Sequence, residues 1–167
     1  MQTPFEVEIG PLLRAKNLKL VLAESCTGGL VGHRITNIPG SSDYYLGSVT
    51  AYAYEAKERL LGVSHETLLA HGAVSRETAI EMARGVRQAL ATDFGDEQIM
   101  GVSVTGIAGP GGGTPTKPVG LVWIALSTPS GDWAYQFIWS GNREENKAHS
   151  AEQVLRLIWA YLSNTNP

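Results

Sequence analysis

Strand-like and helix-like hydrophobic patterns alternate along the chain. Short apolar runs rich in β-branched residues predict strands, and apolar residues spaced by three or four positions predict amphipathic helices. The expected strands are 18–23, 46–52, 99–105, 119–127 and 133–139. The expected helices are 6–16, 30–38, 55–61, 66–71, a longer one that Ser75 caps, and 143–162. This alternation predicts a single domain over residues 1–167, folded as a three-layer α/β/α sandwich with a mixed, mostly parallel sheet.

The end of the chain carries the clearest helical pattern. One face of residues 143–162 gathers Ala148, Ala151, Val154, Leu155, Ile158, Trp159 and Leu162. This stripe predicts a long helix packed on the sheet. Before it, the turn residues 129–132 separate two strand patterns and predict a hairpin. Trp123, Trp139 and Trp159 lie on apolar stripes, so we expect core packing or a subunit contact rather than ligand stacking.

Composition narrows the class of protein. The 167 residues are 43% hydrophobic and 17% charged, which provides enough apolar side chains for a buried core. The net charge is −3, so there is no broad basic surface and we expect no direct nucleic-acid binding. A single cysteine, Cys26, excludes an internal disulfide framework. No apolar run is long enough for a bilayer, and residues 1–6 lack the order of a signal peptide, so we expect a soluble cytoplasmic protein without membrane association.

A first cluster of polar and glycine residues, 24–29, joins the first predicted strand to the next helix. Free backbone amides and the helix dipole at such a junction can bind an anion. Ser25 and Thr27 can add hydroxyl donors, and Gly28 lets a ligand approach the backbone closely. In the alternative, Thr27 caps the helix and the glycines serve packing. No Lys-Ser or Lys-Thr pair follows the glycines, so the cluster is not a Walker phosphate loop.

A second cluster combines the turn around Ser42 with the segment from Tyr52 to Lys57. Lys57 falls in the first turn of a predicted helix, where the positive end of the dipole and partial burial both lower the pKa of an amine. A neutral lysine can accept the proton of a serine hydroxyl, and Tyr52 could orient or relay that proton. Sequence spacing leaves open whether Ser42 and Lys57 meet. In the alternative, Lys57 is an exposed helix lysine that pairs with Glu58 or Asp43.

Two further segments carry candidate binding residues. A glycine and proline loop, 106–118, leaves the carboxyl end of a predicted strand, where open α/β sheets bind ligands. Thr105 and the loop amides from Gly106 onward can bind a carbonyl, a ribose or a phosphate, whereas the alternative is a flexible surface loop. Arg143, at the start of the last helix, can clamp a phosphate or carboxylate unless it is solvated beside Glu144.

Cysteine and metal chemistry find less support in the sequence. Cys26 lies at a helix start, where a thiolate is favoured, but none of the four histidines has a clear route to it. No two histidines share a ligand spacing, and the carboxylates are scattered over helix faces. We therefore expect no metal centre.

Several short motifs occur together in a fixed order. They are AESCTGG at 23–29, GSS at 40–42, EAK at 55–57, LGV at 61–63, HGAVS at 71–75, TGIAGP at 105–110 and KPVG at 117–120. With Tyr52, Ser140-Gly141 and Arg143, these motifs resemble the nicotinamide-nucleotide amidase (CinA C-terminal) family. The resemblance runs from about Leu20 to the final helix, which is nearly the whole chain.

The resemblance implies a stand-alone three-layer amidase domain that acts in pyridine-nucleotide salvage. It implies hydrolysis of nicotinamide mononucleotide to nicotinate mononucleotide and ammonia, by a homo-oligomer without metal or cofactor. Carried over by position, Ser42 resembles the nucleophile, Lys57 its base and Tyr52 a supporting hydroxyl. Hydrolysis of an amide also needs donors for the oxyanion, which backbone amides of 41–43 could supply. The implied substrate-binding residues are Ser25, Thr27, Gly28, Thr105, Gly106 and Arg143, of which Arg143 suits the phosphate.

The chain departs from the family pattern beside the expected base. The family commonly has Tyr-Ser/Thr-Asn where this chain has Tyr52-Ala53-Tyr54, and Ser48 stands where a glycine is frequent. If the missing asparagine orients the substrate or the lysine, activity falls or substrate choice changes. Two alternatives therefore stay open: a non-catalytic nucleotide-binding or regulatory module that keeps the pocket, and a serine amidase for another small amide.

Overall fold

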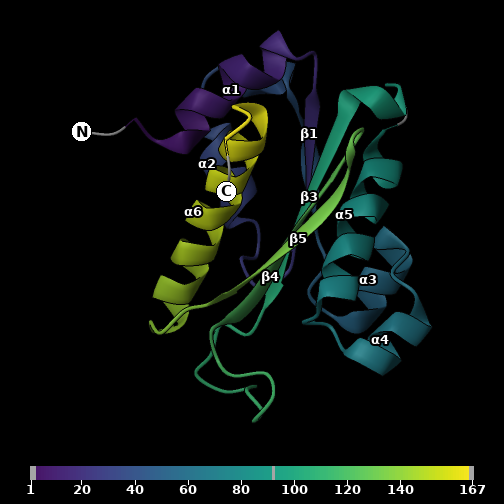
Figure 1. The fold of residues 1–167 in the computed structure, drawn as a ribbon, viewed down its shortest axis with the longest axis vertical. Coiled ribbons are helices and arrows are strands. Elements are labelled where there is room, and N and C mark those ends of the chain that lie inside the picture. The colour runs from purple at the N-terminus through teal and green to yellow at the C-terminus, as the bar shows by residue number, and fades with distance from the viewer. Residues whose placement is uncertain (1–2, 92, 166–167) are drawn as a thin grey trace.

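One five-stranded sheet forms the centre of the fold (Figure 1). The computed structural model describes residues 3–91 and 93–165, so residue 92 and both ends of the expected domain lie outside the description. The strands are β1 (Lys19–Glu24), β2 (Tyr45–Thr50), β3 (Ile99–Gly106), β4 (Leu121–Thr128) and β5 (Gly131–Ile138). Their spatial order is β2-β1-β3-β4-β5. The five predicted strands are confirmed, with ends that shift by at most two residues.

The sheet is mixed, as predicted. β1 pairs in parallel with β2 on one side and with β3 on the other, whereas β4 is antiparallel to both β3 and β5. β1, β2, β3 and β5 therefore share one direction, which β4 opposes. The carboxyl ends of β1, β2 and β3 meet at one edge of the sheet, where α/β proteins with open sheets bind ligands.

Helices cover both faces of the sheet and give the predicted three layers (Figure 1). The helices of one face are α1 (Phe5–Ala15), α2 (Leu30–Thr36) and α6 (Arg143–Leu162). Those of the other are α3 (Tyr54–Leu61), α4 (His65–His71) and α5 (Arg76–Leu90). Two 3₁₀ turns are η1 (Ser41–Asp43) and η2 (Asp96–Gln98). Every helix within the described ranges is too short or too polar to cross a lipid bilayer.

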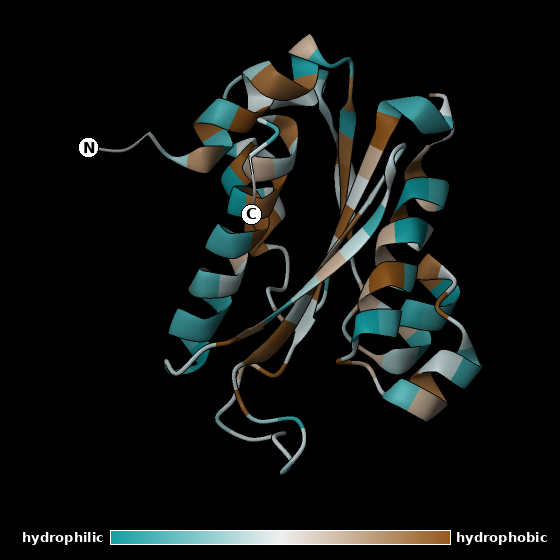
Figure 2. Ribbon diagram, in the orientation of Figure 1, coloured by the Kyte–Doolittle hydropathy of each residue, from teal (hydrophilic) through white to brown (hydrophobic). Residues whose placement is uncertain are grey.

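Alternating side chains of the central strands supply a core on each face of the sheet. In β1, Leu20 and Leu22 pack with α1, α2 and α6, whereas Val21 and Ala23 pack with α3, α4 and α5. All four side chains are at most 1% exposed. Figure 2 shows hydrophobic colour along the central strands and hydrophilic colour on the outer sides of the helices. The central strands β1 and β3 therefore read as almost continuous apolar runs, because both of their faces are covered.

Side chains at the helix starts explain where two of the longer helices begin. The Ser75 hydroxyl accepts a hydrogen bond from the Thr78 backbone amide at 3.1 Å, which confirms the predicted cap of α5. At the start of α6, the Asn142 side chain accepts from the Glu145 amide at 3.1 Å, and the Glu145 carboxylate accepts from the Asn142 amide at 2.8 Å. These contacts satisfy backbone donors that the first helical turn leaves free.

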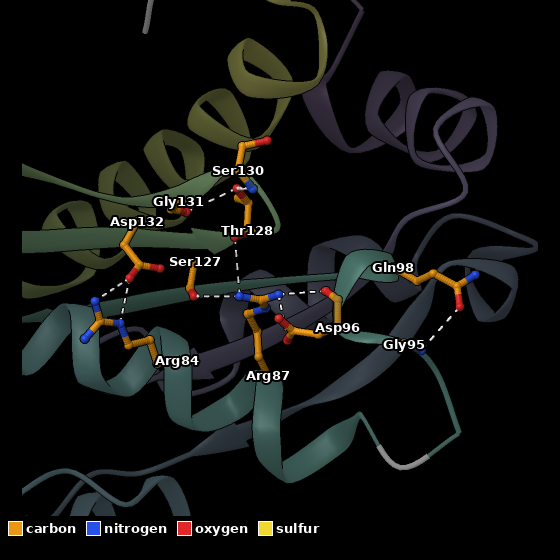
Figure 3. Close-up of polar contacts among 10 residues, drawn as sticks. All are labelled: Arg84, Arg87, Gly95, Asp96, Gln98, Ser127, Thr128, Ser130, Gly131 and Asp132. Atoms are coloured by element: carbon orange, nitrogen blue, oxygen red, sulfur yellow. Dashed lines mark hydrogen bonds and ion pairs between the residues drawn. The ribbon is translucent and has the colours of Figure 1, made fainter.

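Two arginines of α5 fasten the end of the sheet opposite the carboxyl edge (Figure 3). Arg87 is buried; its Nη1 donates to Ser127 Oγ at 3.2 Å, and its Nη2 donates to the Asp96 backbone carbonyl at 2.7 Å. One turn earlier, Arg84 Nε donates to the Asp132 carboxylate at 2.6 Å. These contacts tie α5 to η2 and to the predicted hairpin between β4 and β5, which is also confirmed.

Gly85 marks the closest approach of α5 to α3. A Cβ on Gly85 would lie 1.8 Å from the backbone carbonyl oxygen of Leu61. We expect Gly85→Ala to lower the free energy of unfolding by about 2–4 kcal/mol in urea titrations, because the two helices must move apart. Gly111→Ala is the control, since a Cβ there meets nothing within 4 Å. Equal stability of the two variants would contradict this packing.

Candidate active site

Five segments of the chain meet around a cavity of about 250 Å³ at the carboxyl edge of β1, β2 and β3. They are 25–26 after β1, 52–57 after β2, 73–74 before α5, 105–112 from the end of β3, and Arg143 at the start of α6. The parallel strands bring these loops together although they are distant in sequence. The cavity is therefore lined by residues from three segments that the sequence singled out, 24–29, 52–57 and 106–118.

A buried amine lies in the wall of this cavity. Lys57 is 1% exposed, and its Nζ lies 2.9 Å from Ser25 Oγ. The same nitrogen donates to two backbone carbonyls, that of Ala51 at 2.8 Å and that of Tyr52 at 3.1 Å. None of the ion pairs formed within residues 3–91 and 93–165 includes Lys57. Neutral dipoles, rather than a carboxylate, surround the amine.

Burial lowers the pKa of Lys57 from 10.5 to about 8. The interior disfavours the charged ammonium, because the carbonyl dipoles replace only part of its hydration. The predicted lowering of this pKa is confirmed, with burial as its cause. Near neutral pH about a tenth of the lysine is then uncharged. In that form two N–H groups serve the two carbonyls, and the lone pair faces the Ser25 hydroxyl.

Ser42 lies at the other end of β2. It is exposed in η1, the turn that precedes this strand. The six residues of β2 separate it from the carbonyls that bind Lys57, a span of about 20 Å. The predicted meeting of Ser42 and Lys57 is therefore wrong, and an oxyanion hole at 41–43 would lie away from the amine. The serine that contacts Lys57 is Ser25, which the sequence suggested only as a substrate contact.

Glu24 is the last residue of β1 and is 1% exposed. Its carboxylate lies at the amino-terminal end of α2. Its oxygens accept hydrogen bonds from three backbone amides: Gly29 at 3.0 Å, Val31 at 3.1 Å and Gly32 at 2.8 Å. They also accept from the Thr27 hydroxyl at 2.6 Å. Four donors and the helix dipole compensate the buried charge. The hydrogen bonds to the Glu24 carboxylate therefore hold the loop that carries Ser25 in its conformation.

The amino terminus of α2 is therefore not open to an outside anion, in contrast to the expectation from its sequence. Thr27 is buried with its hydroxyl on Glu24, and Gly28 is exposed with a φ of 63°. Neither residue lines the cavity, so the structure gives both a role in loop shape in place of the predicted substrate contact. Sequence reasoning missed Glu24. A carboxylate directly before a hydroxyl and glycine cluster at a helix start is the signal that identifies it.

Thr105 and Gly106 line the cavity where the sequence expected them. Thr105 Oγ1 donates to the Ala73 carbonyl at 2.7 Å, so the lone pairs of the oxygen remain for a ligand. At Gly106 a Cβ would lie 2.6 Å from the Val122 side chain. Close packing against β4 therefore accounts for a glycine at position 106, and no ligand contact is needed to explain it.

Arg143 is exposed and contacts two other residues that line the cavity. Its Nη2 donates to the Tyr52 hydroxyl at 2.8 Å, and its Nη1 donates to the Gly109 carbonyl at 2.6 Å. The Tyr52 hydroxyl therefore contacts the arginine, whereas only the backbone carbonyl of Tyr52 contacts Lys57. The sequence predicted that this hydroxyl supports proton transfer to Lys57. The structure instead places it in contact with Arg143.

Asn146 is a second residue that sequence reasoning missed. It is 1% exposed on α6, one turn after Arg143. Its Nδ2 donates to the Ala108 carbonyl at 3.0 Å, and its Oδ1 accepts from the Gly141 amide at 3.0 Å. It joins the glycine loop to the segment that leads into α6. An asparagine beside an apolar stripe gives no sequence signal that distinguishes this buried position from a surface one.

Cys26 lines the cavity, but burial raises the pKa of its thiol to about 12. The thiol stays protonated at neutral pH, which favours Ser25 over Cys26 as a nucleophile. In the part of the chain that the structure describes, no group of three or more His, Cys, Asp or Glu side chains is arranged to hold a metal ion.

The fold and cavity define an α/β/α protein with a buried serine–lysine pair at the carboxyl edge of its sheet. Residues 2–162 match the family model of the CinA C-terminal domain, and the chain belongs to this family. A putative competence-damage inducible protein of Moorella thermoacetica is 50% identical over 153 residues, which cover 92% of this chain and 36% of the relative. A CinA-like protein of Salinibacter ruber is 49% identical over 150 residues, which cover 90% of this chain and 35% of the relative. The chain thus spans about a third of the length of these curated relatives.

Solved structures share the whole fold. A competence-damaged protein (CinA) superfamily protein of Klebsiella pneumoniae superposes with a TM-score of 0.88 at 27% identity, covering 98% of this chain and 99% of the other. The competence/damage inducible protein CihA of Agrobacterium tumefaciens superposes with a TM-score of 0.84 at 34% identity, covering 98% of each chain. The three-layer arrangement is therefore shared with other CinA proteins over nearly the full chain.

Glu24→Gln tests whether the carboxylate anchors the loop after β1. The amide removes the charge and turns an NH₂ group toward backbone donors, so we expect the loop to open more often. Cys26 should then react with an aromatic disulfide reagent on the order of 10-fold faster under native conditions. Glu66→Gln is the control, because Glu66 is exposed and its carboxylate contacts Ser64. An unchanged rate for Cys26 in Glu24→Gln would contradict the anchoring role.

Proposed function

We propose that this chain hydrolyses the carboxamide of nicotinamide mononucleotide to nicotinate mononucleotide and ammonia. The observation that carries the proposal is the 2.9 Å contact between Lys57 Nζ and Ser25 Oγ in the wall of a cavity. An amide is a poor electrophile, so its hydrolysis needs an activated hydroxyl and donors for the developing oxyanion. The choice of the mononucleotide follows from the resemblance to the nicotinamide-nucleotide amidases.

Lys57 acts first as a base. Its neutral amine accepts the Ser25 proton while the hydroxyl oxygen attacks the carboxamide carbon. The resulting ammonium returns a proton to the amide nitrogen, the C–N bond breaks, and ammonia leaves. Ser25 then carries the nicotinoyl group of the mononucleotide as an ester.

Water completes the reaction. Lys57, neutral again, takes a proton from a water molecule that attacks the ester carbon. The ester bond breaks, Ser25 Oγ recovers a proton from the lysine, and the acid is released. One water is consumed for each amide, and both protein groups return to their starting states.

The backbone amide of Cys26, directly after Ser25, is suited to the oxyanion. Within the described residues, this amide donates to no backbone carbonyl, and Cys26 lines the cavity. An amide that directly follows a nucleophile is a common oxyanion donor, because it lies close to the attacked carbon. We therefore assign the oxyanion contact to this loop, the one that Glu24 anchors.

Arg143 is suited to the phosphate of the mononucleotide. The contacts with Tyr52 and Gly109 use one N–H of each terminal nitrogen, so three of its five N–H groups remain for phosphate oxygens. Arg143 is exposed and Ser25 is buried, and both line the cavity. A solvent-exposed cation and a buried nucleophile suit a substrate that has a charged group as well as a reacting amide.

The departures from the family pattern leave the serine–lysine pair intact. Ala53 precedes α3 without a side-chain cap, and the Tyr54 hydroxyl accepts a hydrogen bond from the Ala73 amide at 3.3 Å. Within the described residues, neither side chain forms a hydrogen bond with Ser25 or with the Lys57 amine. These substitutions therefore favour an altered substrate affinity over a lost activity.

Ser25→Ala and Lys57→Met test the pair. Each variant should release ammonia from nicotinamide mononucleotide at least about 10³-fold more slowly than the parent, because nucleophile and base act as one unit. Circular dichroism and thermal unfolding check that both variants fold.

Ser42→Ala is the matched control, since Ser42 is an exposed serine at the far end of β2. We expect it to keep the parent rate. An inactive Ser42→Ala beside an active Ser25→Ala would contradict the proposed pair. Calorimetric binding of the mononucleotide without ammonia release would favour the non-catalytic module, and turnover of a different amide in a substrate panel would favour another amidase.

The rate should depend on the protonation of Lys57. Because the neutral amine is the base, kcat/KM should rise with pH and level off above an apparent pKa of about 8. Initial rates of ammonia release between about pH 6 and pH 10 measure this profile. Calorimetry at the same pH values separates substrate binding from turnover. A profile that is flat through this range would contradict the role of Lys57 as base.

A further inference from the structure

Three successive backbone carbonyls between α4 and α5 accept hydrogen bonds from side chains. They are His71, which accepts from Lys117 Nζ, Gly72, which accepts from Thr78 Oγ1 at 2.7 Å, and Ala73, which accepts from Thr105 Oγ1 at 2.7 Å. Within the described residues, no backbone amide donates to any of the three. The turn is therefore held by side-chain donors: Thr78 belongs to the adjacent α5, whereas Thr105 and Lys117 come from distant parts of the chain.

The turn is part of the wall of the Ser25 cavity. Ala73 and Val74 line the cavity, as do Gly109, Gly111 and Gly112 of the glycine loop between β3 and β4. Lys117 belongs to that same loop, 46 residues from His71 in sequence. Its contact with the His71 carbonyl therefore links the glycine loop to the turn, two segments that each contribute residues to the cavity wall.

The glycine loop is closed at its base and at its tip. At the base, the Gly120 amide donates to the Ile107 carbonyl at 2.7 Å. At the tip, the Thr114 amide donates to the Lys117 carbonyl at 2.8 Å, and the Lys117 amide returns a bond to Thr114 at 3.2 Å. The side chain of Lys117 therefore projects from a closed turn, which limits the freedom of its attachment point.

Two groups of contacts hold this loop from opposite layers of the fold. On the α6 side, Arg143 and Asn146 bind the carbonyls of Gly109 and Ala108. On the α4–α5 side, Lys117 binds the turn. Without Lys117, the loop would keep its anchor to α6 and lose its attachment to the turn across the cavity.

Gly72 leaves room for the lysine. A Cβ on Gly72 would lie 3.1 Å from Lys117 Nζ, and the backbone there has a φ of 75°. Glycine therefore serves both the left-handed conformation and the approach of the ammonium.

We propose that Lys117 is a positioning residue that holds the glycine loop against the α4–α5 turn and thereby sets the width of the Ser25 cavity. The inference rests on the proposed function, because it takes this cavity as the substrate site. Lys117 does not itself line the cavity, and it acts through the His71 carbonyl. It therefore affects how tightly substrate is held, while the Ser25–Lys57 pair stays in place.

Hydrogen exchange of the full chain tests the contact without any turnover. Lys117→Met keeps the length of the side chain and removes its donors, so exchange in 72–75 and 107–113 should become on the order of 5-fold faster. Lys117→Arg restores a donor and should bring exchange back to within about 2-fold of the parent. Lys16→Met is the control, because Lys16 is an exposed lysine at the end of α1. Unchanged exchange in both segments of Lys117→Met would overturn the proposal.

Steady-state kinetics with nicotinamide mononucleotide test the consequence for the site. Lys117→Met should raise KM on the order of 5-fold while kcat changes by less than about 2-fold, because the reacting groups are not displaced. Faster exchange with an unchanged KM would also overturn the proposal. A parent protein that releases no ammonia would contradict the proposed function alone, since exchange reports on the Lys117 contact independently of turnover.

Discussion

Within the described residues, the amine of Lys57 is buried without a counter-ion, and the site is arranged around the solvation of that amine. Two carbonyls after β2 and one hydroxyl after β1 take the place of its water shell. These acceptors come together only because β1 and β2 run in parallel and end at the same edge. The sheet topology thus determines the protonation behaviour of one side chain, and that behaviour determines what Ser25 can do.

Glu24 and Lys57 are both buried, and Ser25 follows the first in sequence and contacts the second, yet the two groups are solvated separately. The carboxylate binds the amides at the start of α2, and the amine binds carbonyls. A direct ion pair would have favoured the ammonium and kept the lysine pKa high. Separate solvation leaves the negative charge to hold the loop and leaves the amine free to exchange a proton near neutral pH.

The fold could be predicted from periodicity, because burial on both faces of β1 and β3 and the stripe on α6 leave strong patterns in the sequence. The loops that form the site could also be predicted, because ligands collect where parallel strands end. The pairing of Lys57 with Ser25 rather than Ser42 could not be predicted, because both serines lie in polar turns. They differ in that Ser25 follows the end of β1, whereas Ser42 precedes the start of β2. The role of Asn146 depends on backbone groups that approach it after folding, which its side-chain type does not encode. The position of Glu24 before a hydroxyl and glycine cluster at a helix start does carry a signal.

The most direct measurement is an NMR titration of the Lys57 side chain in the folded protein, following its ε-carbon and ζ-nitrogen shifts. We expect a pKa of about 8, well below the values of the exposed lysines in the same spectrum. A Lys57 pKa of about 10 or higher would contradict the central claim, because the amine would then stay charged and could not accept the serine proton.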